Sequence, residues 1–397
     1  MRATRTRKVM ACLGLALAVT VTGCTTTSGT GPAAANDPIT VGVVTHLSGP
    51  LARYAKPMLD GLKAGVDYAT NGSNEVNGRQ IVLKVVDDAG DPAKAVAAAT
   101  GLVGDGTNII VGTIGSTVAT PMVPFAKENN VLYIIASAAG DEFSGANRNT
   151  FRAGRQTYQD ITAAAAGIGD LQDKKVTVAI QDTAYGRSQA AAVQKVFGAA
   201  GAKVDVATAT ADTTELAPFA AKIAAGRPDF VYVAWSGDTS AALWEAFAQQ
   251  RVRSSSRVAT FLTDRALWPS YGQDAADLTL VAHYDPTIAD GPVAKELLAR
   301  VPQADTFTND GFVTAQMVVH ALQTGDPNDT GSLISALEGW SFEGPKGAST
   351  IRADDHALLQ PMYTVRMTGL PSDRKLEPLL TLDASKTTPP IVIGPGW

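Results

Sequence analysis

Short runs of β-branched residues alternate with longer alanine-rich helical patterns between residues 39 and 263, and this alternation constrains the fold more than any other feature. Strands and helices that alternate at this spacing form βαβ units, which assemble into parallel sheets. The predicted strands span residues 39–44, 81–86, 109–111, 131–135, 176–180, 204–207, 230–234 and 258–263, with a further apolar run at 278–282. The helical patterns span residues 55–70, 92–103, 120–129, 157–171, 188–200, 215–225 and 239–250. The pattern predicts an α/β protein with two separate parallel sheets.

The rest of the chain has a different pattern. Helical segments at residues 292–300, 308–324 and 332–338 have no strands between them, so we expect them to pack on a sheet that already exists. Residues 376–397 contain several prolines and two short apolar runs, which favours edge strands or a surface segment. With 397 residues, 45% of them hydrophobic, the chain is long enough for two domains with separate cores.

The N-terminus has the organisation of a secretory signal. Basic residues up to Lys8 precede an apolar stretch at residues 9–21 that is too short to remain as a membrane span. The residues Val-Thr-Gly before Cys24 resemble the lipobox of bacterial lipoproteins, in which the cysteine carries a diacylglycerol; the alternative is an ordinary signal peptide with a chance cysteine. We predict a signal peptide at 1–23, lipid attachment at Cys24 and a flexible tether at 24–37. The folded body would be extracytoplasmic and lipid-anchored to the cell membrane, on the periplasmic side where an outer membrane is present.

The charge of the chain argues against nucleic-acid binding. The formal net charge is −5, and without the first 23 residues the chain carries 29 basic and 38 acidic residues, a net charge of −9. A nucleic-acid partner would require a basic surface to neutralise phosphates, and none is evident.

Cofactor, metal and catalytic motifs are not found in the sequence. Loss of Cys12 with the signal leaves Cys24 as the only thiol, so no disulfide, cysteine metal site or catalytic cysteine is expected. The four histidines lack metal-ligand spacing: His46, His283, His320 and His356. Three aspartates at a strand end are interpreted as solvated or hydrogen-bonded residues, one of them a helix cap: Asp87, Asp88 and Asp91. We expect no metal, no cofactor and no enzymatic activity.

Residues 107–143 indicate a binding site. An apolar strand ends in a turn rich in Gly and Ser, and a helix follows before the next apolar strand. Such a turn directs unpaired backbone N–H groups and hydroxyls at one point beyond the strand end, which favours an anion. Ser116 can offer its hydroxyl and its N–H there, together with the N–H of Thr117; the alternative is that Ser116 only caps the helix.

Six segments, taken in order, resemble the branched-chain amino acid and amide family of ABC-transporter solute-binding proteins. They are GVVTHLSGPLARYAKPMLDGLKAGVDYAT, IVLKVVDDAGDPAKAV, IIVGTIGSTVATP, NTFRAGRQTYQD, VAIQDTAYGRSQA and PDFVYVAW. The resemblance runs from Ile39 to about residues 342–347. It implies a two-lobed type I periplasmic-binding-protein fold, each lobe a parallel sheet flanked by helices, with three interlobe crossings near Gln156, His283 and Pro361. The lobes would comprise 38–156 plus 283–361 and 157–282 plus 362–397, closing on a ligand between them.

The resemblance also implies ligand-binding residues on the first lobe. The serine that matches Ser116 binds the α-carboxylate in amino acid binders of this family. Ser137 and Ala139 match positions that present a backbone carbonyl and, commonly, a threonine hydroxyl. Because Ala139 lacks this hydroxyl, amides and modified amino acids remain candidates beside standard amino acids. Tyr54 matches an aromatic residue that points into the cleft, with core or hinge packing as the alternative.

The second lobe would complete the cleft. Tyr185 matches a tyrosine that points at the ligand, again with packing as the alternative. Trp235 and Ser236 replace a Gly-Gly-Tyr type segment, so Trp235 either stacks on the ligand or lies on the surface. Asp264 or Asp238 would answer a ligand ammonium; alternatively, Asp264 pairs with its neighbouring arginine and Asp238 caps a helix.

These inferences predict a monomeric solute-binding lipoprotein of an ABC importer. It would capture a small polar solute, of the amino acid or amide class, and deliver it to the permease subunits. The alternative is a sensory protein that binds amides, urea or amino acids and reports their presence to a signalling partner.

Overall fold

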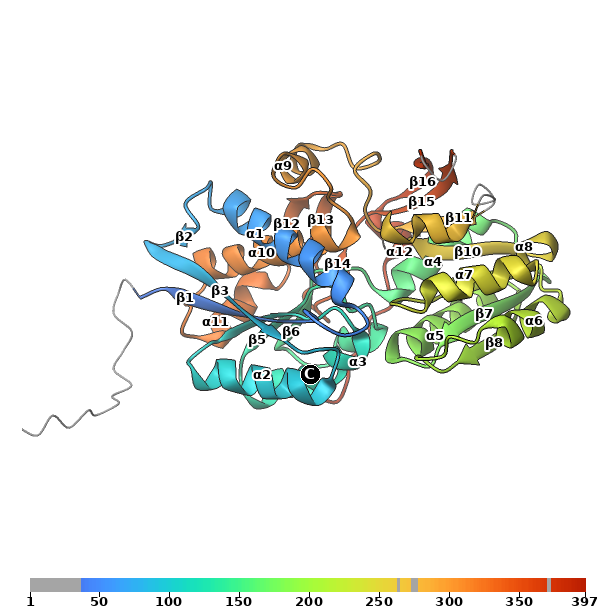
Figure 1. Cartoon of the computed structure of the whole chain (residues 1–397). Coiled ribbons are helices and arrows are strands. Elements are labelled where there is room, and N and C mark those ends of the chain that lie inside the picture. The colour runs from blue at the N-terminus through green and yellow to red at the C-terminus, as the bar shows by residue number, and fades with distance from the viewer. Residues whose placement is uncertain (1–36, 263–264, 273–277, 370–372) are drawn as a thin grey trace, which may run out of the picture. The chain divides into compact units, whose positions relative to one another are not determined.

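Figure 1 shows the computed structural model, which describes residues 37–262, 265–272, 278–369 and 373–397. Residues Pro38–Trp397 form one compact unit. The predicted signal peptide, Cys24 and nearly all of the predicted tether lie outside the described residues. In the part of the chain that the structure describes, no helix is long and apolar enough to cross a membrane.

The first sheet has six strands in the order β2-β3-β1-β4-β5-β6. They are β1 (Ile39–Thr45), β2 (Glu75–Val76), β3 (Arg79–Asp87), β4 (Ile109–Gly112), β5 (Leu132–Ile135) and β6 (Thr150–Arg152). Neighbouring strands are parallel except β2 and β3. Every residue of β4 and β5 is buried, which explains why these strands appear in the sequence as continuous apolar runs.

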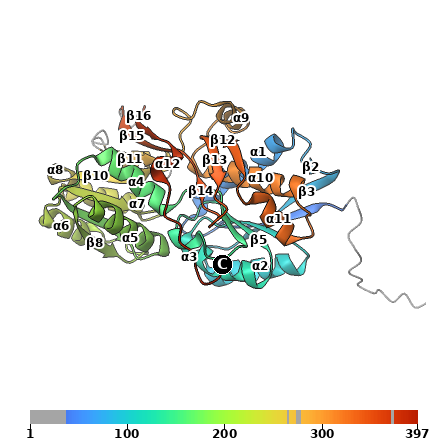
Figure 2. The ribbon, with the colours of Figure 1, turned by 180° about the vertical axis from the view of Figure 1, so that it is seen from behind.

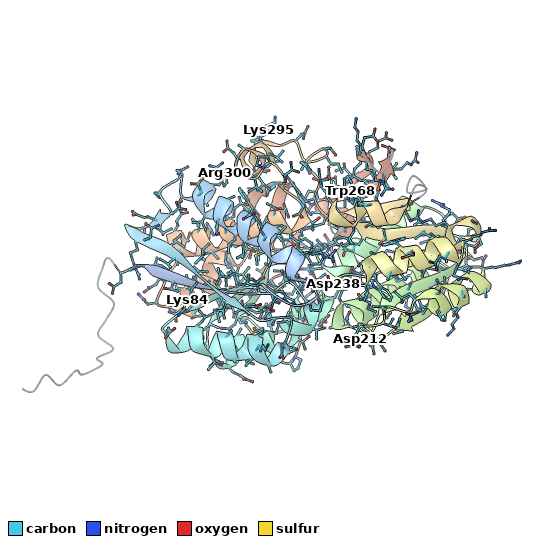
Figure 3. All side chains as sticks on the ribbon, viewed as in Figure 1. Lys84, Asp212, Asp238, Trp268, Lys295 and Arg300 are labelled. Carbon is cyan, nitrogen blue, oxygen red and sulfur yellow. The ribbon has the colours of Figure 1, made fainter. Side chains whose placement is uncertain are left out.

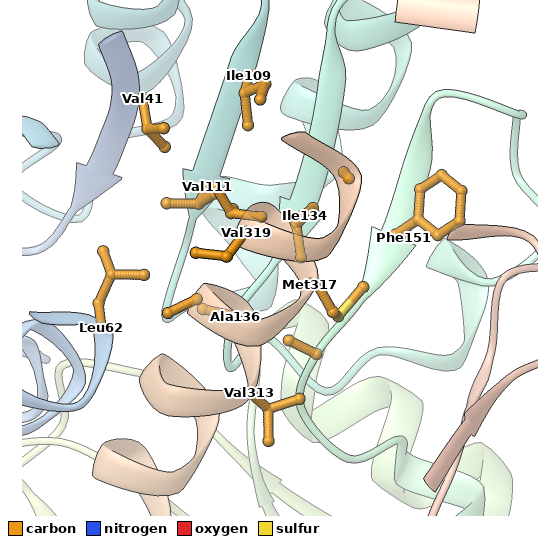
Figure 4. Packing of buried hydrophobic residues seen from close by; sticks show 14 of the residues in the cluster. Val41, Leu62, Ile109, Val111, Ile134, Ala136, Phe151, Val313, Met317 and Val319 are labelled. Carbon is orange, nitrogen blue, oxygen red and sulfur yellow. The ribbon is translucent and has the colours of Figure 1, made fainter. Parts of the chain in front are cut away.

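Helices cover both faces of this sheet. One face is covered by α1 (Ala55–Ala69), α10 (Thr306–Thr324) and α11 (Thr330–Leu337), and the other by α2 (Pro92–Gly104) and α3 (Ser116–Glu128). Successive side chains of a strand point to opposite faces, so Val111 packs with the first group and Ile110 with the second. Figure 4 shows Val111 beside Val319 of α10 in this core.

The second sheet has seven strands in the order β16-β15-β11-β10-β9-β7-β8. They are β7 (Lys175–Gln181), β8 (Lys203–Ala209), β9 (Phe230–Ala234), β10 (Arg257–Leu262), β11 (Leu278–Ala282), β15 (Met362–Thr368) and β16 (Lys375–Leu382). The first five are parallel, whereas β15 and β16 are added antiparallel at one edge, as Figure 2 shows from behind. The helices around it are α4 (Thr157–Ile168), α5 (Ala184–Ala199), α6 (Ala217–Gly226), α7 (Ser240–Gln249) and α8 (Val252–Ser255), with the 3-10 helix η3 (Arg265–Tyr271).

Three segments connect the elements of the two sheets. They are residues 153–156 between β6 and α4, residues 283–291 between β11 and α9 (Pro292–Arg300), and residues 360–361 between β14 (Leu358–Leu359) and β15. A small third sheet contains β12 (Ser341–Gly344), β13 (Gly347–Ile351) and β14. The remaining short helices are η1 (Ala52–Tyr54), η2 (Asp141–Phe143) and α12 (Ala384–Thr387).

The predicted α/β class, with parallel sheets flanked by helices, is confirmed, and each predicted strand is present in the described residues. The short strands β2, β6, β12, β13 and β14 and the strand β15 were not predicted. Asp91 caps α2 by accepting from the N–H groups of Ala93 and Lys94, as interpreted from the sequence. The residue bounds of the two lobes stay a prediction. At the C-terminus, Gly394 and Gly396 contact Gly145 and Asn147, which belong to loops of the first sheet.

Candidate functional site

A small cavity lies at the carboxyl ends of strands from both sheets. It has a volume of about 50 Å³. Its walls are Leu51, Tyr54, Ile114, Gly115, Ser116, Ser137, Ala139, Arg155, Tyr185, Ser236 and Phe307. Ser116 and Ser137 follow β4 and β5 of the first sheet, and Tyr185 and Ser236 follow β7 and β9 of the second. The carboxyl end of a parallel sheet is where ligands bind in open α/β folds. Six of the ten predicted ligand-binding residues therefore line one cavity.

Ser116 is the first residue of α3, and Gly115 occupies the cap position. The hydroxyl of Ser116 is buried and accepts a hydrogen bond from the N–H of Gly140, 3.3 Å away. The first N–H groups of a helix have no partner within the helix, and the positive end of the helix dipole lies there. This wall of the cavity is suited to an anionic oxygen.

The backbone around Ala139 is already hydrogen-bonded. The carbonyl of Ala139 accepts from the N–H and the hydroxyl of Thr157, at 2.8 and 3.0 Å. Arg152, which is 1% exposed, donates to the carbonyls of Ala138 and Gly140 at 2.8 and 2.5 Å. The carbonyls of residues 138–140 are thus used to hold the wall together.

Ser137 has a buried hydroxyl beside this wall. Asp310 lies close to it, but no hydrogen bond of ordinary geometry satisfies the Ser137 Oγ atom. A buried polar atom without a good partner costs stability, and such an atom at a cavity wall is available to a ligand.

Two tyrosines line the cavity, Tyr54 before α1 and Tyr185 in α5. Tyr54 is 2% exposed, stacks on Phe307 with ring centroids 4.3 Å apart, and accepts at its hydroxyl from the N–H of Gly237 at 3.4 Å. It therefore both packs and lines the cavity. Tyr185, near the start of α5, places its hydroxyl near Arg155, and burial raises the pKa of Tyr185. No hydrogen bond of ordinary geometry satisfies this hydroxyl.

Ser236 and Trp235 end β9 but have different surroundings. Ser236 lines the cavity and donates its N–H to the Gln181 side chain at 3.0 Å. Trp235 is 5% exposed, packs on Phe219, and donates from Nε1 to the hydroxyl of Thr239 at 2.9 Å. The tryptophan lies neither against the cavity nor on the surface, because its ring fills the core of the second sheet.

The other predicted residues do not line the cavity. Asp238 is exposed and pairs with Arg53 at 2.8 Å, and Figure 3 labels it on the surface. It does not cap α7, because Thr239 holds that position. Thr117 is exposed and accepts at its hydroxyl from the N–H of Ala184 at 3.4 Å. Asp264 lies outside the described residues.

Arg155 is the main residue that the sequence did not single out. It is 4% exposed, its Nε donates to Asp160 at 3.1 Å, and its guanidinium lies 3.7 Å from the ring centroid of Phe261. Burial lowers the pKa of Arg155, but Asp160, Tyr185 and Asp310 together outweigh this effect, so the net shift of the pKa is upward. The sequence signal that could have identified Arg155 is a charged residue in the short segment 153–156, which connects the two sheets. Phe307, Leu51 and Ile114 were also missed, since they read as ordinary core residues.

A second buried cluster lies beside the segments that connect the sheets. His283 follows β11, and its Nε2 lies 2.7 Å from Asp310 of α10. Its Nδ1 lies 2.9 Å from the amine of Lys346, between β12 and β13. An ammonium group can only donate, so a charged Lys346 assigns the hydrogen of His283 to Nε2. Burial raises the pKa of Asp310 to about 6 and lowers the pKa of both His283 and Lys346.

Among the described residues, no group of three or more His, Cys, Asp or Glu is placed to hold a metal ion. Asp87 and Asp88 have protein partners instead, in the loop after β1: Asp87 accepts from Ser48 at 2.7 Å, and Asp88 pairs with His46 at 2.9 Å.

Comparison with known proteins agrees with this architecture. Residues 38–374 match the Periplasmic binding protein family. The chain is 28% identical to Leu/Ile/Val-binding protein homolog 3 of Brucella melitensis, over 75% of this chain and 83% of that protein. It is 27% identical to Leu/Ile/Val-binding protein BraC3 of Rhizobium johnstonii, over 76% and 83%.

Solved structures of ABC-transporter proteins are also similar to this chain. An ABC-type branched-chain amino acid transporter from Rhodopseudomonas palustris has a TM-score of 0.73 at 30% identity, covering 89% of this chain and 99% of that one. A solute-binding protein of an ABC transporter from the same species, in complex with benzoate, has a TM-score of 0.76 at 25% identity, covering 87% and 96%. The chain therefore belongs to the periplasmic binding protein family, whose members are solute-binding proteins of ABC transporters.

Proposed function

We propose that this protein is an extracytoplasmic lipoprotein that captures a small polar solute bearing a carboxylate or amide and delivers it to the permease of an ABC importer. The observation that carries the proposal is the cavity itself. Hydroxyl groups and a helix N-terminus from the first sheet meet a tyrosine and a serine from the second sheet around one space. A ligand in this space would contact the elements of both sheets and hold them together. In a two-lobed receptor, such closure distinguishes the loaded state from the empty one.

Contacts across the cavity support this mechanism. Tyr54 and Thr117, from the first sheet's elements, bond with the N–H groups of Gly237 and Ala184 from the second. Arg53 and Asp238 add an ion pair between the same two groups of elements. A ligand that bridges the two walls would favour the arrangement in which these contacts form, because it binds that arrangement more tightly.

The solute class is proposed from the walls and from the relatives. Ser116 would receive a carboxylate or amide oxygen, while Leu51, Ile114 and Phe307 would contact an apolar body. Relatives are named for binding leucine, isoleucine and valine, and one structural neighbour holds benzoate. Small amino acids, amides and aromatic acids are therefore the first candidates.

A thermal-shift screen tests the binding function. The protein would be residues 24–397 with Cys24→Ser, which removes the proposed lipid, and the panel would contain amino acids, amides, urea and aromatic acids. A ligand at 100 times its Kd stabilises the folded state by about 2.7 kcal/mol. We expect at least one compound to raise the melting temperature. If none does, the proposed solute class is wrong.

The lipid anchor and the transport role have separate tests. Mass spectrometry of the N-terminal peptide from membranes should show a diacylglycerol on Cys24, and Cys24→Ser should release the protein from the membrane fraction. Uptake of the stabilising solute should fall when the gene is deleted. Unchanged uptake would contradict delivery to a permease and would favour the sensory alternative.

A further inference from the structure

We infer that the ligand is an organic acid without an amino group, and that Arg155 selects it. This inference rests on the proposed binding function and narrows its ligand. It starts from the charges at the cavity. Among the eleven described residues that line it, Arg155 is the only one with a charged side chain, and none is a carboxylate.

The position of Arg155 leaves part of its guanidinium for a ligand. Asp160 accepts from Nε, and Asp160 is held in turn by Gln189 at 3.3 Å. Phe261 covers one face of the guanidinium plane. Asp160 does not use the two terminal Nη groups, and Arg155 lines the cavity near the Tyr185 hydroxyl, which no hydrogen bond of ordinary geometry satisfies. A guanidinium held in this way offers two parallel donors, which match the two oxygens of a carboxylate.

The backbone carbonyls of residues 138–140, which could accept from a ligand ammonium group, are already hydrogen-bonded. The carbonyl of Ala139 accepts twice from Thr157, and Arg152 occupies the carbonyls on either side of it. Asp238 is exposed and bonded to Arg53. Asp310, which lies behind Ser137, is bonded to His283 and does not line the cavity. A ligand ammonium would therefore lie near the Arg155 guanidinium without a lining carboxylate, among the described residues, to compensate it. Like charges in a buried site disfavour each other.

The remaining walls describe the body of the ligand. Leu51, Ile114 and Phe307 are apolar, and Tyr54 is stacked on Phe307 as one aromatic surface. A branched aliphatic or aromatic group would fit against these side chains. Hydroxyls of Ser137, Ser236 and Tyr185 can bond a further polar substituent of the acid. The ligand class is thus a small monocarboxylic acid with an apolar or aromatic body.

Matched pairs of ligands test this on the unaltered binding site of residues 24–397 with Cys24→Ser. Calorimetry would compare isocaproate with leucine, hydrocinnamate with phenylalanine, and benzoate with benzamide. In the leucine pair or the phenylalanine pair, we expect the acid without an amino group to bind about tenfold more tightly, or better, than its partner. If leucine and phenylalanine bind more tightly than their deaminated counterparts, the inference is overturned while the binding function stands. If no compound binds, both are overturned.

Variants of Arg155 give an independent readout. Arg155→Gln removes the charge, so the acid-to-amide affinity ratio for benzoate and benzamide should fall towards one, whereas Arg155→Lys should keep part of it. An unchanged ratio in a folded Arg155→Gln variant would overturn the role of Arg155. A purely structural role would weaken both ligands equally and leave the ratio unchanged. Because the ligand pairs are measured on the unaltered site, they decide the ligand class even if Arg155→Gln does not fold.

Discussion

Gly311 lies where α10 crosses α1, and Gly311→Ala is the sharpest test of how the first sheet's helices build the cavity. A Cβ atom at this position would be 2.0 Å from the carbonyl oxygen of Met58 and 2.7 Å from the N–H nitrogen of Leu62. Both atoms belong to the backbone of α1, so no side-chain rotation can relieve the overlap. The two helices would have to separate.

The separation has a cost that can be bounded. Restoring an ordinary contact requires a shift of roughly 1.4 Å between α10 and α1, in a core packed to crystal-like density. Overpacking of this kind costs typically 1–3 kcal/mol, and because backbone meets backbone we expect about 3 kcal/mol. The same shift would part Tyr54, at the start of α1, from Phe307 of α10, whose rings are 4.3 Å apart. Ligand affinity should therefore fall together with stability.

Urea denaturation followed by circular dichroism measures the loss, and Gly101→Ala is the matched control. Gly101 lies within α2, and nothing lies within 4 Å of a Cβ atom built there. That substitution should stabilise the protein by about 0.5–1 kcal/mol, because alanine loses less backbone entropy than glycine. A loss below about 1 kcal/mol for Gly311→Ala, or an equal effect in both variants, would refute the helix-crossing argument.

Three further predictions concern buried polar groups. Ser116→Ala should weaken the binding of a carboxylate ligand by about 1–3 kcal/mol in calorimetry. An unchanged affinity would show that the Ser116 hydroxyl does not contact the ligand. Burial raises the pKa of Asp141 to about 6, so between about pH 4 and pH 6 the folded protein holds a proton that the unfolded chain has lost. As the pH rises through this range, the free energy of unfolding of the wild type should therefore fall relative to that of Asp141→Asn, and then level off. If the free energies of unfolding of the wild type and of Asp141→Asn changed in parallel with pH, this prediction would be wrong. Lys346→Met should cost about 1–3 kcal/mol, because it removes the amine from the buried Nδ1 of His283 and takes away one of the two cations near Asp310. In a double-mutant cycle with Asp310→Asn, strictly additive losses would show that the two residues are uncoupled.

Much of the fold could be predicted, because its strands are locally encoded. Buried strands such as β4 and β9 are continuous apolar runs, and the helices between them are rich in alanine. The unpredicted strands have weaker local signals. β6 has three residues, and β14 has two. Such short strands exist because a neighbouring strand supplies their hydrogen bonds, which no local pattern reports.

The candidate site was predictable in part. Ser116, Ser137 and Tyr185 follow strands whose carboxyl ends meet at one edge, so their convergence follows from the βαβ pattern and the family resemblance. Trp235 shows the limit of that reasoning. Its backbone is at the strand end, as expected, but its ring turns towards Phe219 and the core. The direction of the ring depends on how α6 packs on the second sheet, which the local sequence around Trp235 does not report.

The sequence by itself determined the α/β class, the order of strands and helices, and the hydroxyl-rich turn at the start of α3, because periodicity and turn chemistry act over a few residues. Only the tertiary structure decided the charge of the cavity. Arg155 reaches it because Asp160 holds Nε and Phe261, from β10, covers the guanidinium. Likewise, the Ala139 carbonyl is occupied because α4 places Thr157 beside it. The contact between Arg155 and Phe261 joins residues far apart in the chain, and the energies of all three contacts depend on burial, which local sequence patterns do not specify.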